Sequence, residues 1–195
     1  MNKLQGFLEL RKSGLPSVPW EKFCNDSILD DNLLWTVRSA VQQGNDLNLP
    51  RKVGVSSEEA TKFAKELINS FASNDMVIYY PYFVAIKSGV IDVSSNKVVI
   101  EAVSGDLWNL VTFNNKDVTI ISTDNDLKFI GNSNFLTTDE LLELADYSTK
   151  VRRQFQQYLL NGKSVFLEWS YACKADRNGS KLGEPSLVFY EIRTV

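Results

Sequence analysis

Apolar and polar positions in the first third of the chain predict two helices and one buried strand. Apolar residues on one side of positions 3–12 predict a short helix, and the compact run Leu33 to Val37 is typical of a buried strand. Two serines and two glutamates at positions 56–59 predict the start of a second helix, because a hydroxyl caps the first turn and acids suit its dipole. Three apolar residues then recur every four positions, the spacing of one helix face: Phe63, Leu67 and Phe71.

The remaining two thirds are dominated by β-branched and aromatic runs between short polar turns, a pattern typical of an antiparallel meander. The predicted strands are Met76 to Phe83, Val84 to Val93, Lys97 to Val103, Leu107 to Phe113, Val118 to Ser122, Ser164 to Tyr171 and Ser186 to Ile192. Between the strands Val118 to Ser122 and Ser164 to Tyr171 we expect a long helix. Thr137 or Thr138 caps it, with Glu140 as capping partner, and Gly162 closes it. The elements together predict an α+β fold with largely antiparallel sheets and flanking helices.

Composition narrows the possible functions. The 195 residues suit a single domain over 1–195, with approximate lobes 1–75 and 76–195, and 44% hydrophobic residues suffice for a core. A net charge of -3 gives no support for a nucleic-acid or membrane surface, and we expect a cytoplasmic protein with two reduced cysteines. The chain has no histidine, which excludes Ser-His or Cys-His catalysis and phosphohistidine intermediates within it.

Two basic residues are candidate phosphate contacts. Lys3, near the start of the first helix, can hold a phosphate as a compact charge, although on local grounds a solvated surface lysine is the simpler explanation. Arg38 follows the buried run LLWTV, where its planar fork can project into a cleft and bind phosphate oxygens. A structural ion pair with a nearby carboxylate is the alternative for Arg38.

The last two strands carry a second group of candidates. Glu168 lies between Leu167 and Trp169 on an apolar strand, and Glu191 and Arg193 lie near the end of the final strand. Two acids on neighbouring strands can share a Mg²⁺ ion, which prefers carboxylates together with substrate phosphates. The alternative is that both acids simply face water.

The order of these segments resembles the N-terminal ATP-grasp nucleotide-binding domain of the phosphoenolpyruvate synthase and pyruvate phosphate dikinase family. The segments that carry the resemblance are NKLQGFLELRKSGLPSVPW, WTVRSA, YYPYF followed by SGV, IEAVSG, FLEWSYA and FYEIRTV. The resemblance implies nucleotide or phosphate contacts and metal contacts on those segments. The nucleotide contacts are Lys3, Arg38, Tyr80 and Arg193, and the metal contacts are Glu168 and Glu191.

The chain also departs from that family. QQGND stands at positions 42–46 in place of an acidic pair, GDLW at positions 105–108 replaces the segment with the ribose-binding glutamate, and a segment with further arginines is shortened. Two hypotheses follow. In the first, the chain binds ATP and Mg²⁺ and supports phosphoryl transfer to a small molecule or to a partner chain with a phosphohistidine or acceptor domain. In the second, it is a non-catalytic relative that acts as a binding or scaffold module for a protein partner.

Overall fold

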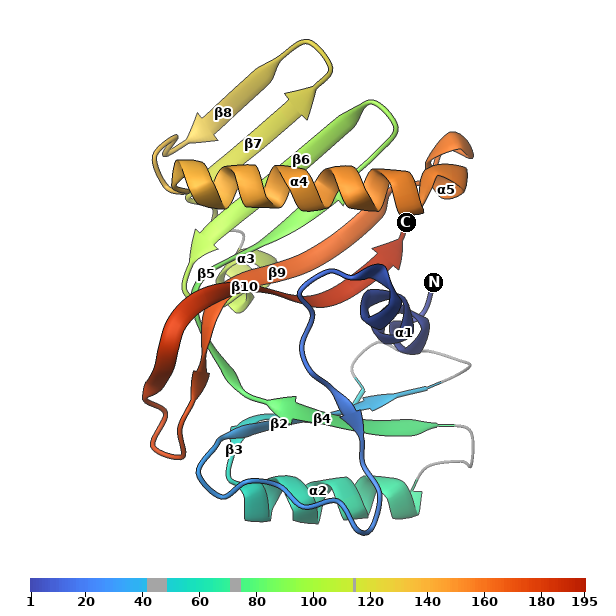
Figure 1. Cartoon of the computed structure of the whole chain (residues 1–195), viewed down its shortest axis with the longest axis vertical. Coiled ribbons are helices and arrows are strands. Elements are labelled where there is room, and N and C mark those ends of the chain that lie inside the picture. Colours follow the sequence, from blue (N-terminus) through green and yellow to red (C-terminus); the bar gives the residue numbers. More distant parts are fainter. Residues whose placement is uncertain (42–48, 71–74, 114) are drawn as a thin grey trace.

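The computed structural model describes residues 1–41, 49–70, 75–113 and 115–195, which form two antiparallel sheets with helices packed against them (Figure 1). The helices are α1 (Lys3–Ser13), α2 (Ser57–Ser70), α3 (Trp108–Phe113), α4 (Thr138–Gln154) and α5 (Gln156–Leu160). The strands are β1 (Glu21–Lys22), β2 (Trp35–Ala40), β3 (Arg51–Val55), β4 (Met76–Pro81), β5 (Phe83–Val93), β6 (Lys97–Ser104), β7 (Val118–Thr123), β8 (Leu127–Gly131), β9 (Val165–Ala175) and β10 (Lys181–Thr194). The predicted α+β class, with two largely antiparallel sheets and flanking helices, is confirmed.

The small sheet has the strand order β1-β4-β2-β3, and α2 covers its outer face (Figure 1). Alternation along β2 separates two sets of side chains. Trp35 and Val37 pack against α2, whereas Thr36 and Arg38 point away from it, toward the large sheet. Phe71, predicted to extend the apolar face of α2, lies outside the described residues.

The large sheet has the order β10-β9-β5-β6-β7-β8, and α4 lies across one of its faces (Figure 1). Leu144 and Val151 of α4 pack there with Ile91, Ile100 and Trp169 of the sheet. The short helix α3 packs on the opposite face of the sheet. Its Leu110 contacts Val90 and Val103, whose side chains alternate along their strands with those that face α4.

Helix α1 lies against β10 and approaches its backbone closely. Gly6 makes this possible, because a Cβ atom at that position would lie only 2.5 Å from the carbonyl oxygen of Ile192. Phe7, one residue later, packs with Ile78 of the small sheet and Val188 of the large one. The first helix thus bridges the two sheets and holds Lys3 near the end of β10.

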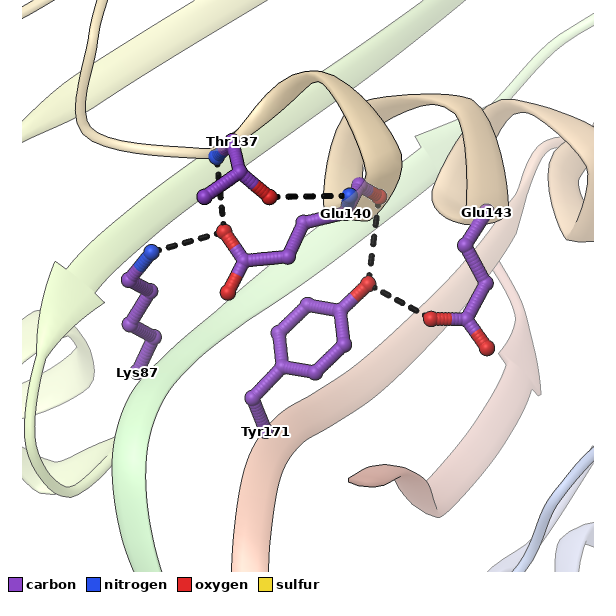
Figure 2. Close-up of polar contacts among 5 residues, drawn as sticks. All are labelled: Lys87, Thr137, Glu140, Glu143 and Tyr171. Carbon is purple, nitrogen blue, oxygen red and sulfur yellow. Dashed lines mark hydrogen bonds and ion pairs between the residues drawn. The ribbon is translucent and has the colours of Figure 1, made fainter. Parts of the chain in front are cut away.

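A set of hydrogen bonds that we call the helix-anchoring network ties the start of α4 to the large sheet (Figure 2). Thr137 and Glu140 form the predicted capping box, which identifies Thr137 rather than Thr138 as the cap. Glu140 Oε2 also accepts from Lys87 Nζ of β5 at 2.6 Å, and the Tyr171 hydroxyl of β9 lies 2.9 Å from Glu143 Oε2. The network comprises Lys87, Thr137, Glu140, Glu143 and Tyr171.

One predicted strand is wrong. Residues 108–113, within the expected strand Leu107 to Phe113, form the helix α3. Gly105 ends β6 with a left-handed backbone, φ 72°, and the Asp106 side chain accepts a hydrogen bond from the backbone N–H of Trp108 at 2.8 Å. This local turn starts a helix and overrides the strand propensity of the apolar residues that follow.

Candidate functional site

Four charged residues from the two sheets meet in what we call the arginine–glutamate cluster: Arg38, Glu168, Glu191 and Arg193. Arg38 comes from β2 of the small sheet, Glu168 from β9, and Glu191 with Arg193 from β10. Arg38 lies 3.8 Å from Glu191, and Arg193 lies 3.5 Å from Glu168 and 2.7 Å from Glu191 between nitrogen and oxygen atoms. The candidates singled out from separate stretches of sequence therefore lie together in space.

A β-bulge at Tyr190 brings Glu191 into this cluster. Phe189 pairs with Trp169, but the next pair is Glu191 with Glu168, so β10 advances two residues while β9 advances one. The bulge lets both Phe189 and Ile192 point into the core although they are three positions apart. Glu191 consequently shares a sheet face with Glu168.

Hydrogen bonding within the cluster is incomplete. Glu191 is only 4% exposed, yet its Oε1 and the facing Arg193 Nε, both buried, make no hydrogen bond with acceptable geometry. Their 2.7 Å approach is therefore an ion pair without hydrogen-bond alignment. Buried polar atoms left without an aligned partner are uncommon, and in the part of the chain that the structure describes others lie on Asp92, Arg152 and Trp169. Incomplete pairing therefore does not by itself distinguish the cluster.

The charges of the cluster compete with one another. Burial raises the pKa of Glu168 above its ordinary value, and the neighbouring Glu191 raises it further. The cations of Arg38, Arg193 and Lys3 lower that pKa without cancelling the rise. Burial by itself lowers the pKa of Arg38, but Tyr80 and Glu191 outweigh it and the net shift is upward. Glu168 thus lies close to a second carboxylate, at a position that disfavours its charge.

A cavity of about 350 Å³ opens between the two sheets beside the cluster, and we call it the aromatic cleft. Its polar and charged lining residues are Thr36, Arg38, Arg51, Asp106, Glu168 and Ser170, and its aromatic ones are Tyr80, Tyr82, Phe83, Trp108 and Tyr190. Burial raises the pKa of the Tyr82 and Tyr190 hydroxyls, so both stay protonated and can donate hydrogen bonds. The cleft offers flat apolar surfaces with a few polar groups, a composition common in small-molecule sites.

A second hollow of about 280 Å³ adjoins the cleft, and we call it the cationic pocket. It is lined by Lys3, Arg38, Ser39, Leu49, Pro50 and Arg51, with no acidic side chain among these residues. Arg38 and Arg51 line both hollows. A larger hollow of about 520 Å³ between α1 and the α4–α5 junction contains none of the predicted site residues.

Arg38 and Arg51 stand directly opposite each other in the antiparallel pairing of β2 with β3. Like charges in this position repel and destabilise a sheet unless something compensates them. A second bulge, with Gly54 at φ 67°, adds a residue to β3 between the pairs Trp35–Val55 and Val37–Lys52. Because of it, Arg51 and Val53 line the cleft while Val55 packs toward α2.

The predicted residues occupy different parts of this site. Lys3 lines the cationic pocket, Tyr80 and Glu168 line the aromatic cleft, and Arg38 lines both. Glu191 and Arg193 lie behind them in the ion-paired cluster. The QQGND segment at positions 42–46 lies outside the residues that the structure describes.

Sequence reasoning missed Arg51 and Trp108. Arg51 lies on β3, a strand that was not predicted because its run RKVGV is short and mostly polar. Trp108 lies in the segment that was predicted as a strand. One signal was available for the cluster: the buried Leu187, Phe189 and Ile192 are spaced by two and then three positions, which requires a bulge between the last two.

The two glutamates fit a Mg²⁺ ion only together with further oxygen ligands. They are cross-strand partners, and Glu191 Oε1 has no aligned hydrogen bond. The described residues contain no group of three or more acidic or cysteine side chains that could hold a metal. Mg²⁺ requires an octahedral shell, so phosphate oxygens and waters would have to complete it.

Comparisons with known proteins find distant structural likenesses but no relative by sequence. No protein-family model matches the chain, and no curated protein matches its sequence. Among solved structures it is similar to the macrocyclase MdnC from Microcystis aeruginosa MRC, determined with the precursor peptide MdnA. The two are 11% identical with a TM-score of 0.41, and the likeness covers 97% of this chain and 51% of MdnC, so the chain spans about half the length of that protein. A likeness this distant assigns no ligand or activity.

These comparisons correct one expectation. The proposed membership of the phosphoenolpyruvate synthase and pyruvate phosphate dikinase family is wrong, because neither a family model nor a curated relative supports it and the structural likeness is to a different protein. The motifs that suggested it, such as IEAVSG and FLEWSYA, lie on partly buried strands. Alternating apolar and polar residues are common to many such strands and identify no family. The expected phosphohistidine partner loses its support with the family.

The described helices contain no segment that is both long and apolar enough to cross a lipid bilayer.

Proposed function

We propose that this chain binds ATP in an ATP-grasp-like cleft between its two sheets, with the phosphates in the cationic pocket and the base in the aromatic cleft. The observation that carries the proposal is the pair Arg38 and Arg51, which face each other across two strands and line both hollows. Glu191 already balances part of the Arg38 charge, and an anion between the two guanidinium groups would balance the rest and accept hydrogen bonds from both.

Charge supports the placement of the phosphates. Lys3 joins the two arginines around the cationic pocket, and Arg193 lies behind them. Arginine presents its donors in a planar fork that matches phosphate oxygens, and lysine adds a compact charge. The four cations are Lys3, Arg38, Arg51 and Arg193, and the two glutamates of the cluster cancel at most two of their charges. The remaining positive charge favours a polyanion such as a triphosphate.

The aromatic cleft supports the placement of the base. It adjoins the cationic pocket at the shared arginines, so one ligand with an anionic part and a flat part can occupy both. Tyr80 lies on the inner face of the small sheet, where it contributes an aromatic wall. In this proposal Tyr80 therefore contacts the base.

Mg²⁺ has a secondary place in the proposal. Glu168 and Glu191 would hold it together with phosphate oxygens, and the ion would neutralise charge on the triphosphate. Both carboxylates also pair with arginines, so they orient the phosphate-binding side chains whether or not a metal is present. The proposal concerns binding, and no acceptor for a phosphoryl group is assigned.

Isothermal titration calorimetry and thermal melting with ATP, adenosine and tripolyphosphate, each with and without Mg²⁺, test the proposal. We expect ATP to bind more tightly than either fragment and to raise the melting midpoint, because a ligand that binds only the folded state stabilises it by about 2.7 kcal/mol at a hundred times its Kd. Absence of both heat and a midpoint shift at millimolar ATP would reject nucleotide binding and leave the scaffold hypothesis.

A further inference from the structure

Trp108 differs from the other tryptophans of the chain. Its exposed fraction is 52%, whereas Trp20, Trp35 and Trp169 are at most 7% exposed, and all four lie within the described residues. The other three belong to the hydrophobic core clusters. A single exposed aromatic residue would need no explanation by itself, so its surroundings decide its meaning.

The surroundings of Trp108 are those of a binding surface. Its backbone N–H is held by Asp106 at the start of α3, and its ring lines the aromatic cleft. Val53 of the small sheet lines the same cleft from the opposite lobe and is 51% exposed. Two large apolar side chains, one on each lobe, thus remain open to solvent at a single cavity.

Arg51 connects this apolar pair with the phosphate-binding region. Its guanidinium carbon lies 5.9 Å from the centre of the Trp108 ring, within reach of a cation–π contact across the cleft. Arg51 also lines the cationic pocket beside Lys3 and Arg38. A ligand that places a flat ring at Trp108 therefore has its anionic part directed toward Arg51.

We propose that Trp108 and Val53 sandwich the base of the bound nucleotide and make the cleft selective for purines. The proposal rests on the nucleotide-binding function above and names its specificity-determining residue. Stacking on an aromatic ring depends on the overlapping flat area, and a purine offers two fused rings where a pyrimidine offers one. Arg51, whose guanidinium lies over the Trp108 ring in the free chain, would leave that ring face to the base and turn toward the phosphates.

The exposure of Trp108 provides a direct measurement. Acrylamide quenches exposed tryptophans, so in the free protein most of the quenchable fluorescence should come from Trp108. ATP and adenosine should protect it, whereas tripolyphosphate should not, because tripolyphosphate has no ring. Purine nucleotides should bind more tightly than pyrimidine nucleotides with the same number of phosphates, because their stacked area is larger.

A substitution separates stacking from phosphate binding. Trp108→Ala should weaken ATP binding about 5-fold or more and leave tripolyphosphate affinity unchanged, while Trp108→Phe should retain most of the affinity. Tyr158→Ala is the matched control, because Tyr158 is 48% exposed and lies on α5, away from the cleft. Circular dichroism checks that each variant is folded.

The outcomes distinguish the two proposals. If calorimetry detects ATP binding but Trp108 stays accessible to acrylamide and Trp108→Ala binds ATP like the original chain, the stacking proposal is wrong and the binding function stands. If neither ATP nor tripolyphosphate binds, the binding function itself is wrong and the stacking proposal falls with it.

Discussion

The arginine–glutamate cluster and the helix-anchoring network are both partly buried groups of charged and polar residues that join different elements, yet they differ in the length and alignment of their contacts. In the network, Glu140 Oε2 accepts from Lys87 at 2.6 Å and from the backbone N–H of Thr137 at 2.7 Å (Figure 2). In the cluster, two of the three ion pairs are longer than 3.4 Å and the third lacks hydrogen-bond alignment.

This difference indicates different roles. A network of short, aligned hydrogen bonds fixes one arrangement and contributes to stability. An incompletely paired group keeps donors and acceptors available for something else, at a cost in stability when it is buried. We therefore expect substitutions in the network to change the free energy of unfolding and substitutions in the cluster to change ligand binding.

The largest expected effect is on ATP binding by Arg38→Met. A charge-assisted hydrogen bond contributes about 1.5–3 kcal/mol, so losing it should weaken ATP binding roughly 10- to 150-fold. Calorimetry measures this loss, and Arg38→Lys should recover only part of the affinity because lysine cannot form the planar fork. The matched control is Arg153→Met, at an exposed position of α4. Unchanged ATP affinity in Arg38→Met would remove this arginine from the binding site.

A second prediction concerns the helix-anchoring network. Tyr171→Phe removes the hydroxyl that lies 2.9 Å from Glu143 Oε2 and 3.1 Å from the Glu140 carbonyl oxygen. The free energy of unfolding should fall by about 1–2 kcal/mol, the range for a partly buried hydrogen bond. Urea denaturation measures this change, and ATP affinity should stay the same. A variant with unchanged stability but weaker ATP binding would show that the comparison assigns the two groups the wrong way round.

The sequence predicted the fold class well because the strands and the main helices carry strong local patterns. The capping box at Thr137 and the apolar face of α2 are set by short-range rules, and the structure contains both. That Arg38 and Glu168 would share a site followed only from the family resemblance, because they lie on strands of different sheets and no local pattern fixes how the sheets meet. Their ligand and their role stay predictions.

Other parts of the site depend on a bulge and a turn that the pattern of apolar and polar residues does not reveal. Arg51 enters the site through a bulge in a short polar edge strand, and Trp108 enters it through a helix that begins with the side chain of Asp106. In both cases a single turn or an extra residue determines which face of the element points into the cleft. The family resemblance was wrong because most of its motifs were strand patterns that many unrelated sheets share.

A third, smaller effect is the pH dependence of stability caused by Glu168. Its pKa is raised in the folded state by burial and by Glu191, so the folded chain binds this proton more tightly than the unfolded chain does. The contribution of Glu168 to stability is therefore present below its unfolded pKa and is lost as pH rises through the raised folded pKa. Glu168→Gln should remove this decline.

Urea denaturation at a series of pH values from 4 to 8 compares the two proteins. The original chain should lose stability relative to Glu168→Gln as the pH increases, and Asp139→Asn, at an exposed position in the first turn of α4, is the control. A constant difference across this range would mean that Glu168 has the same pKa in the folded and the unfolded chain. A difference that shifts in favour of the original chain as the pH rises would mean that the cluster stabilises the charged form of Glu168.

The smallest effect should come from Lys3→Gln. Lys3 lines the cationic pocket and helps to lower the pKa of Glu168, but it is only partly buried and salt screens its charge. We expect ATP affinity to fall about 2- to 5-fold, corresponding to about 0.5–1 kcal/mol for an exposed charge pair. The loss should shrink between 50 mM and 500 mM salt, whereas the loss in Arg38→Met should persist, because buried charge pairs are screened much less. Equal salt sensitivity of the two variants would place Arg38 among the solvent-exposed charges and reduce the cluster to an ordinary surface group.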